Sequence, residues 1–379
     1  FCLQQAGLEA HEVDYVVFYE KPFVKLERLL KTILQTVPRS GRLFREAMGT
    51  WCADKLWIQD RLCRELGVAQ SRVMFTDHHQ AHAASAFYCS PFEEAAILTI
   101  DGVGEWACGT VGWGKGTRLQ MNHEIRFPHS PGLLYSTFTA FLGFEVNEGE
   151  YKVMGMASYG RPRYVDKIRR IVRIYSDGSV WLDLDYFAFP YSTRTSFNRK
   201  FITLFGAPRD PQHAHRLEPY YCDVAASIQA VIEEVVVAMA RYALQESKLD
   251  RLCYAGGVAL NSVANGRILR ETSAQALFVQ PAAGDSGGAL GAALYVHHAV
   301  LGHPRQFVME HAFWGPEYRQ GEIEDFLTDS RIHYERIEQE EPLLAAVVDL
   351  LQRGKVVGWF QGRSEWGPRA LGHRSILAD

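Results

Sequence analysis

The chain has 379 residues, of which 47% are hydrophobic and 22% charged, and a formal net charge of −4. These proportions are ordinary for a soluble globular protein; they exclude collagen, coiled coil or disorder over the whole chain, and the length predicts two or three domains. The charge balance lacks the positive field typical of nucleic-acid-binding proteins. With no long apolar run and no leader pattern, we expect neither a transmembrane helix nor a signal peptide.

The seven cysteines are scattered along the chain, and no C-x-x-C pair occurs among them. Because disulfide scaffolds and zinc ribbons depend on paired spacings, these cysteines indicate buried free thiols. Free thiols are typical of reducing compartments, and we therefore expect a cytoplasmic protein.

Apolar runs and helical periodicity alternate through the first 160 residues. The run AAILTI at 95–100 is continuous, as is typical of a strand buried on both faces. In chain order, the pattern predicts a strand at 13–19, helices at 23–34 and 42–66, a strand at 72–75, a helix at 79–88, strands at 95–100, 109–113 and 119–127, and helices at 133–142 and 152–159.

The middle of the chain begins with weaker signals. Asp177-Gly178 predicts a hairpin over 176–184, and the Arg-, Pro- and His-rich residues 189–220 predict an irregular surface segment. A helix with a wide apolar face is expected at 223–247. A strand, a glycine turn and a helix then follow one another twice, at 252–255 with 258–270 and at 277–279 with 289–300.

The composition changes near residue 304, and a helix at 343–352 and a strand at 356–360 follow. Strands that alternate with helices predict an α/β protein whose sheet is covered by helices. Glycine turns that enter helices bring N–H groups and helix N-termini to one sheet edge, where anions bind in such folds.

His78 and His82 are four residues apart in the sequence HHQAH. On a helix this spacing puts both imidazoles on one face, where they can bind one metal ion. The zinc-protease pattern H-E-x-x-H requires a glutamate where this chain has His79, so a protease is disfavoured. Histidines that cap the helix or face solvent are the alternative interpretation.

Two glycine-flanked aspartates are further candidate ligands. Asp101 ends a predicted buried strand, and Asp285 lies between glycines at the start of a predicted helix. Carboxylates in such places are frequent ligands for a metal or a metal–phosphate. A simple turn residue and a helix cap are the alternatives.

The glycines at the two strand-to-helix junctions, Gly256 with Gly257 and Gly284 with Gly287, permit close approach of the backbone to a ligand. Asn261 adds an amide one turn later. The turns match neither a G-x-G-x-x-G fingerprint nor a Walker loop, and ordinary tight turns are the alternative.

Basic residues stand beside glycines in two places. Lys152 follows Glu150, a pattern for which a solvated salt pair is the default interpretation. Arg363, Arg369 and Arg374 are set among glycines near the end of the chain. Arginine clusters bind phosphate or carboxylate in a forked manner, and a solvated basic turn is the alternative.

Taken together, these motifs resemble the carbamoyltransferases of the nodulation-protein-U and antibiotic O-carbamoyltransferase type. The resemblance covers almost the whole chain and is weakest at 161–220. It depends on the stretches 78–87 (HHQAHAASAF), 101–105 (DGVGE), 132–135 (GLLY), 151–160 (YKVMGMASYG), 256–266 (GGVALNSVANG), 284–293 (GDSGGALGAA) and 362–379.

The resemblance implies two domains. Residues 1–335 are expected to form a duplicated, ribonuclease H-like domain of the actin/Hsp70/sugar-kinase superfamily, and 336–379 the beginning of a threonylcarbamoyl-adenylate-synthase-like α/β domain. The second domain is implied to make carbamoyl-adenylate from carbamoyl phosphate and ATP. The first is implied to transfer the carbamoyl group to a hydroxyl of a small-molecule or sugar acceptor.

The resemblance also implies roles for residues. A divalent metal, usually iron, with zinc and manganese as the alternatives, is implied at His78, His82, Asp101 and Asp285. Catalytic roles are implied for Lys152 and Asp101. The expected nucleotide-binding residues are Gly256, Gly257, Asn261, Gly284 and Gly287, and the expected anion-binding residues are Arg363, Arg369 and Arg374.

The chain departs from the family at both ends. The family's N-terminal glycine-containing hairpin and His-Asp pair are missing, and only the opening of the C-terminal domain is present. Because the first residue is Phe1 rather than Met, we expect a fragment with an incomplete adenylate-forming site, which leaves the activity of the chain alone open.

Three other functions stay open: an ATP-dependent kinase or ATPase of the same superfamily, transfer of threonylcarbamoyl to tRNA, and an inactive nucleotide-binding fragment. A kinase has no need of the histidine pair, and the net charge of −4 gives little support to tRNA binding. We expect no nucleic-acid and no membrane partner. The acceptor, the metal and the oligomeric state are not determined by the sequence.

Overall fold

The computed structural model describes residues 1–213 and 216–379. The protein folds into two compact units, one formed by Ala6–Val308 and the other by Met309–Asp379 together with Phe1–Gln5. The functional boundary at 335/336 stays a prediction.

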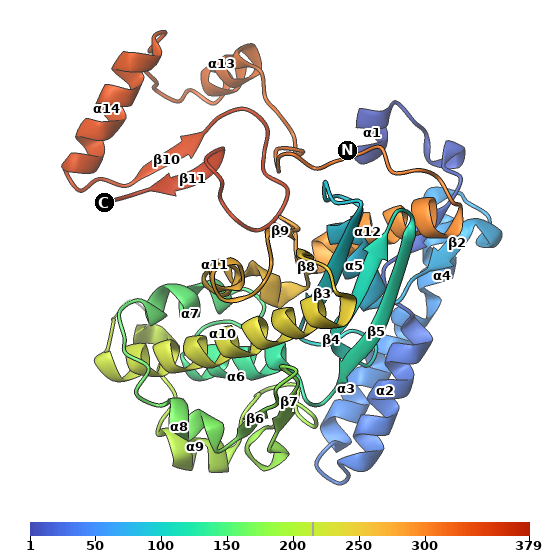
Figure 1. Ribbon diagram of the computed structural model, residues 1–379. Coiled ribbons are helices and arrows are strands. Elements are labelled where there is room, and N and C mark those ends of the chain that lie inside the picture. Colours follow the sequence, from blue (N-terminus) through green and yellow to red (C-terminus); the bar gives the residue numbers. More distant parts are fainter. Residues whose placement is uncertain (214–215) are drawn as a thin grey trace. The chain divides into compact units, whose positions relative to one another are not determined.

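A five-stranded mixed sheet forms the centre of the larger unit (Figure 1), with its strands in the order β5-β4-β3-β8-β9. The strands are β3 (Glu94–Ile100), β4 (Ala107–Lys115), β5 (Arg118–Arg126), β8 (Arg251–Ala255) and β9 (Ala276–Val279). β3, β8 and β9 are parallel, whereas β4 is antiparallel to both β3 and β5. The carboxyl ends of the three parallel strands therefore meet at one edge of the sheet.

Helices cover both faces of this sheet, as the continuous apolar run of β3 predicts. Leu98 belongs to the core cluster that includes the apolar face of α10 (Pro219–Ser247). Ile97, its neighbour along the strand, belongs to the cluster on the other face, with α5 (His78–Phe87). α12 (Asp285–Tyr295) packs against α5. Burying each such side chain stabilises the fold by about 1.5–3 kcal/mol.

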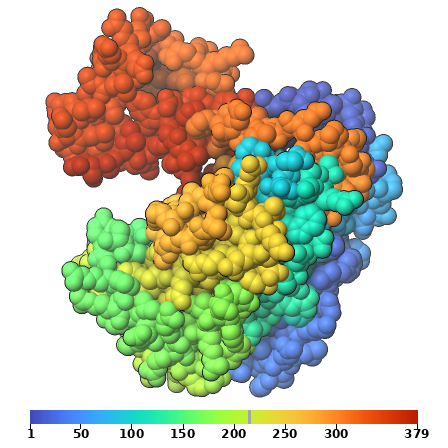
Figure 2. Space-filling view, viewed as in Figure 1, coloured from blue at the N-terminus to red at the C-terminus, as the bar shows by residue number. Residues whose placement is uncertain are grey.

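The other elements of the larger unit surround this sandwich. Before α5 come β1 (Val16–Phe18), α2 (Pro22–Gln35), α3 (Gly41–Ala53), α4 (Ile58–Leu66) and β2 (Val73–Phe75), and β1 pairs with β2 in parallel. Between β5 and α10 come α6 (Pro131–Phe141), α7 (Glu150–Ala157), α8 (Val165–Arg169), β6 (Val172–Ile174), β7 (Val180–Leu182) and α9 (Arg199–Phe205). α11 (Ser262–Glu271) packs beside α10, and the two helices adjoin at the surface shown in Figure 2.

The smaller unit contains α13 (Gln320–Asp329), α14 (Glu340–Gln352) and the antiparallel pair β10 (Val357–Phe360) and β11 (Arg374–Leu377). The short helix α1 (Cys2–Ala6) spans the division between the units. The expected helix at 343–352 and strand at 356–360 are confirmed, with bounds that differ by three residues or fewer.

The irregular segment expected at 189–220 is wrong in one part, because α9 forms there. Asn198 caps this helix by accepting the N–H groups of Lys200 and Phe201. Phe201 and Phe205, four residues apart, are buried against Phe138 of α6. The asparagine cap and the i, i+4 aromatic pair are sequence signals that outweigh the proline-rich flanks.

Two further predicted elements differ from the structure in their bounds. The single helix expected at 42–66 is divided at Asp54, where the 3₁₀ turn Lys55–Trp57 separates α3 from α4. The hairpin expected over 176–184 begins earlier, because its first strand, β6, precedes the turn at Asp177-Gly178. Both differences concern where elements end, which periodicity determines less well than their type.

The predicted α/β class is confirmed in its coarse form: a central mixed sheet with helices on both faces. The actin-like duplication and the likeness of the C-terminal part to adenylate synthases stay predictions. Among the described residues, no helix is both long enough and apolar enough to cross a bilayer.

Close packing of α5 against α12 depends on Gly291, since a Cβ at this position would lie 1.9 Å from the carbonyl oxygen of Ala81. We expect Gly291→Ala to lower the free energy of unfolding by about 1–3 kcal/mol through overpacking. Gly155→Ala, in α7, is the matched control, because its Cβ would meet nothing within 4 Å. It is expected to stabilise the chain by about 0.5–1 kcal/mol. Urea unfolding measures both, and equal effects would contradict the packing argument.

Candidate metal centre

α5 carries the two histidines of the HHQAH sequence and begins at the first of them, His78. The carboxylate of Glu105 accepts the N–H of His78 with both oxygens, at 3.2 and 3.1 Å. This bond satisfies one of the N–H groups that a helix start leaves without an intrahelical partner. His82 follows one turn later on the same helix face, as the spacing predicts.

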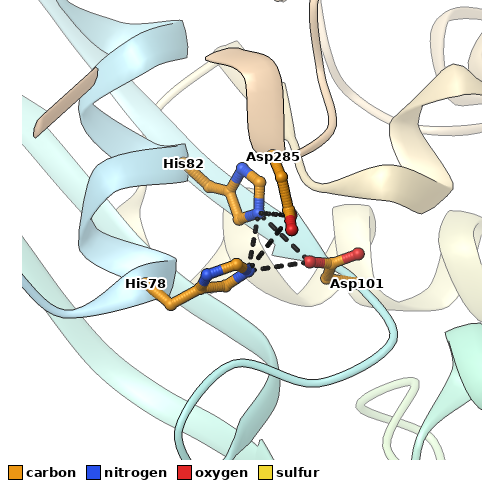
Figure 3. A group of neighbouring side chains, drawn as sticks. All are labelled: His78, His82, Asp101 and Asp285. Carbon is orange, nitrogen blue, oxygen red and sulfur yellow. Dashed lines mark hydrogen bonds and ion pairs between the residues drawn. The ribbon is translucent and has the colours of Figure 1, made fainter. Parts of the chain in front are cut away.

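The four predicted metal ligands converge: one ligand atom from each of His78, His82, Asp101 and Asp285 lies within 4.8 Å of all the others (Figure 3). Asp101 follows β3, and Asp285 is the first residue of α12, which follows β9. The parallel strands thus bring residues that are far apart in the sequence to the same sheet edge. The convergence is confirmed, and metal binding itself stays a proposal.

The distances within the group are short. The Nε2 atoms of His78 and His82 lie 3.1 Å apart, and they lie 2.9 and 3.1 Å from Oδ2 of Asp101. Oδ1 of Asp285 lies 3.5 and 3.8 Å from the same two nitrogens. The histidines are buried, whereas the side chain of Asp285 is 60% exposed, so the group is open on the side of Asp285.

Burial and charge act against each other on these groups. Burial raises the pKa of the Asp101 carboxyl, but hydrogen bonds from His78 and His82 outweigh it and hold the pKa well below its ordinary value. Burial lowers the pKa of the His78 imidazole, but Asp101 outweighs it and raises the pKa. An ionised Asp101 is therefore present at neutral pH, as a metal ligand must be.

The donor set fits a divalent cation. Ligand atoms about 2.1 Å from one ion are separated by about 3.0 Å at right angles and about 3.4 Å in a tetrahedron. The two Nε2 atoms lie at similar distances, 2.9–3.8 Å, from each other and from the nearest aspartate oxygens. Two neutral imidazoles that face each other through Nε2 can share only one proton, whereas a cation accepts both lone pairs. Nδ1 of each ring is buried without a hydrogen-bond partner in the described part of the chain, so the polar contacts of both rings pass through Nε2.

Two glycines let neighbouring segments approach Asp101. Gly256 has φ +93°, and a Cβ there would lie 2.2 Å from the carbonyl oxygen of Ile100. The N–H of Gly257 donates to Oδ1 of Asp101 at 3.1 Å. The Gly256 N–H also donates to the carbonyl of Ala283, so the two predicted glycine turns adjoin.

The other predicted nucleotide-binding residues have structural contacts. Asn261 caps α11 by accepting the Ala264 N–H, and its amide exchanges two hydrogen bonds with Gln229. A Cβ at Gly287 would lie 2.0 Å from the carbonyl oxygen of Ala282, whereas Gly284 is open. Nucleotide binding by these residues stays a prediction.

The predicted basic residues lie on other elements than the four-residue group and the glycine turns. Lys152 is on α7, with Nζ 5.8 Å from the centre of the Tyr151 ring. In the smaller unit, Arg363 donates to the carbonyls of Trp314 and Gly315, and Arg374 donates to those of Gln361, Gly362 and His373. Arg369 lies in the same loop, between β10 and β11.

The motifs of the sequence assign no role to two residues beside the four-residue group. The Tyr19 ring lies 5.7 Å from that of His78, and burial, together with Asp285, Glu20 and Asp101, raises the pKa of its hydroxyl to about 12. Glu105 lies within the DGVGE stretch, but no pattern in the sequence assigns it a role.

His79 is buried, and burial together with the two neighbouring histidines lowers its pKa to about 3, so its ring is neutral.

Comparison with known proteins identifies the family. The chain matches the family model for the carbamoyltransferase N-terminus over residues 1–294 and that for the carbamoyltransferase C-terminus over residues 348–379. The chain belongs to the carbamoyltransferase family. The sequence resemblance to this family is thereby confirmed.

Several curated proteins are similar to this chain in sequence. An uncharacterized protein of Synechocystis is 47% identical to this chain, and the match covers all of this chain and 63% of the length of that protein. Nodulation protein NolNO of Sinorhizobium fredii is 36% identical, and the match covers all of this chain and 53% of the length of NolNO. The 3'-hydroxymethylcephem-O-carbamoyltransferase of Streptomyces clavuligerus is 34% identical over 44% of this chain and 30% of its own length. The chain thus spans less than two thirds of the lengths of these relatives.

Proposed function

We propose that the protein to which this chain belongs is an O-carbamoyltransferase that uses a divalent metal at His78, His82, Asp101 and Asp285. The convergence of these four side chains within 4.8 Å is the observation that supports this proposal best. The family membership supports the transfer of a carbamoyl group, and the name of the Streptomyces relative supports an oxygen acceptor.

The proposed reaction has two steps. Carbamoyl phosphate, ATP and water give carbamoyl-adenylate, pyrophosphate and phosphate. An acceptor hydroxyl then attacks the carbamoyl carbon. The new C–O bond forms as the bond to the phosphate oxygen breaks, and AMP leaves with that electron pair. The hydroxyl proton passes to a base. The acceptor is a hydroxylated small molecule or a sugar.

The proposed roles of this chain's residues follow from their surroundings. The metal, when bound, supplies Lewis-acid chemistry that offsets negative charge on the reacting oxygens. Asp101 suits a ligand better than a proton acceptor, because its low pKa and its three hydrogen bonds engage the carboxylate. Lys152 is proposed to face a phosphate.

The glycine turns support a nucleotide site at the same sheet edge. Gly256, Gly257, Gly284 and Gly287 are proposed to bring N–H groups to the nucleotide, with Asn261 fixing the start of α11. We also propose that residues 1–335 serve carbamoyl transfer in an actin-like architecture, and that 336–379 open the adenylate-forming domain.

The full-length protein tests this function. It is incubated with ATP, carbamoyl phosphate and a panel of hydroxylated acceptors, and products are identified by mass spectrometry. We expect AMP, pyrophosphate, phosphate and a carbamoylated acceptor. Release of ADP with a phosphorylated acceptor would instead assign a kinase, and a salt-sensitive complex with tRNA would assign threonylcarbamoyl transfer to RNA.

A further inference from the structure

The buried carboxylate of Glu105 joins two segments that flank the metal centre. Its Oε1 accepts the main-chain N–H of Lys21 at 2.8 Å and that of His78 at 3.2 Å, while Oε2 accepts the His78 N–H at 3.1 Å. Glu105 is only 6% exposed. These bonds connect the turn after β1 to the first residue of α5, although the two lie far apart in the sequence.

The loop that carries Glu105 also carries a metal ligand. Asp101 starts this loop, and its N–H donates to the carbonyl of Cys108, while the Gly104 N–H donates to that of Ala107. These two bonds fix the loop against the start of β4. The position of Glu105 is therefore tied to that of Asp101 through a short stretch of hydrogen-bonded backbone.

The same loop touches His78 directly. A Cβ added to Gly104 would lie 2.9 Å from Cβ of His78, so only a glycine lets the loop come this close. The loop thus contacts the metal centre at both of its ends: Asp101 supplies a ligand, and Glu105 holds the helix start that carries another.

The second segment held by Glu105 brings Tyr19 to the centre. Tyr19 lies two residues before Lys21, its ring packs near His78, and a Cβ at Gly288 of α12 would meet it at 3.0 Å. An ion pair between Lys21 and Asp77 at 2.8 Å lies beside the Glu105 bonds, but both of its side chains are about half exposed. A backbone bond from the Thr76 N–H to the Phe18 carbonyl at 3.0 Å also joins these parts of the chain. Glu105 adds a buried side-chain link that reaches both Lys21 and His78.

We propose that Glu105 is a positioning residue of the metal centre, which fixes His78 relative to Asp101 by accepting the main-chain N–H groups of His78 and Lys21. The inference rests on the proposed metal at the four-residue group. Its effect comes from hydrogen-bond geometry more than from negative charge, because Oε1 accepts both N–H groups and a glutamine also offers one oxygen. A glutamine loses only the second bond of the His78 N–H, which goes to Oε2.

Titration of the metal-free chain with Co²⁺, followed by its d–d absorption, tests this role. Glu105→Ala is expected to weaken Co²⁺ binding about 10- to 100-fold and to alter the spectrum, as loss of a residue that supports a ligand does. Glu105→Gln is expected to bind within about threefold of the unmodified chain, because a neutral hydrogen bond replaces a charge-assisted one. Glu94→Ala, which removes an exposed glutamate paired with Lys115, is the matched control.

Hydrogen–deuterium exchange of the same metal-free proteins separates this proposal from the metal site itself. Peptides containing Lys21 and His78 are expected to exchange faster in Glu105→Ala, and not in Glu105→Gln or Glu94→Ala. Three outcomes would overturn the proposed role of Glu105. They are unchanged exchange in Glu105→Ala, Co²⁺ affinity in Glu105→Ala equal to that of the unmodified chain, and Co²⁺ binding by Glu105→Gln as weak as that by Glu105→Ala. Faster exchange in a chain that binds no Co²⁺ would overturn the proposed metal function and leave the link between the segments in place.

Discussion

Replacing His82 by alanine is expected to weaken divalent-metal binding by at least about 100-fold. Loss of a residue that only supports a ligand weakens binding by up to about 100-fold, and His82 is itself a proposed ligand. His82 is fully buried, and its Nε2 faces both His78 and Asp101, so its removal takes one proposed ligand out of the group. The loss leaves one histidine with two carboxylates of unequal exposure. Metal content after dialysis and Co²⁺ titration measure the effect.

His123→Ala is the control for this substitution. His123, on β5, is about half exposed and pairs with Glu246 at 3.5 Å, so its removal is expected to leave metal binding unchanged. Thermal unfolding of both variants shows whether they are folded. If a folded His82→Ala protein binds metal as tightly as His123→Ala, the four-residue group is not the metal site.

We propose that Arg369 makes a forked contact with a phosphate in the adenylate-forming step of the full-length protein. Because such a contact is worth about 2.7 kcal/mol, Arg369→Ala is expected to lower the proposed carbamoyl-adenylate formation by at least about 100-fold. Its loop is braced by Glu365, whose Oε1 accepts the N–H groups of Leu371, His373 and Arg374. Burial raises the pKa of Glu365, but these backbone bonds outweigh it and lower the pKa to about 2, so the brace stays ionised at neutral pH.

Transfer from carbamoyl-adenylate supplied ready-made is expected to survive in Arg369→Ala, because the proposed transfer step uses the metal centre. Arg353→Ala is the control, since Arg353 pairs with Asp349 on the exposed surface beside α14 in the same unit. Separate assays of the two half-reactions measure the split. Equal loss of both in a folded Arg369→Ala protein would contradict the division of labour between the two domains.

The sequence is sufficient for the four-residue group because each of its features is local or follows from topology. The histidine spacing needs only a helix, and the two aspartates follow strands whose parallel order places their ends together. Glu105 and Tyr19 could not be found in this way. Glu105 meets Lys21 across 84 residues, and no periodicity in the chain marks that contact.

The misplaced elements have a similar physical reason. Prolines on both sides obscure α9, although its asparagine cap and two phenylalanines, which the fold buries, are visible in the sequence. The break between α3 and α4 depends on a turn in which the Trp57 indole donates to the carbonyl of Cys52. Such tertiary and side-chain contacts override a helical pattern that continues through them.

Anomalous diffraction from crystals of the chain grown with Co²⁺ is the most direct test of the proposed metal centre. We expect one strong peak about 2.1 Å from Nε2 of both His78 and His82, with carboxylate oxygens of Asp101 and Asp285 in contact with it. A protein that holds cobalt only at other positions, with the two histidines still 3.1 Å apart and no peak between them, would contradict it.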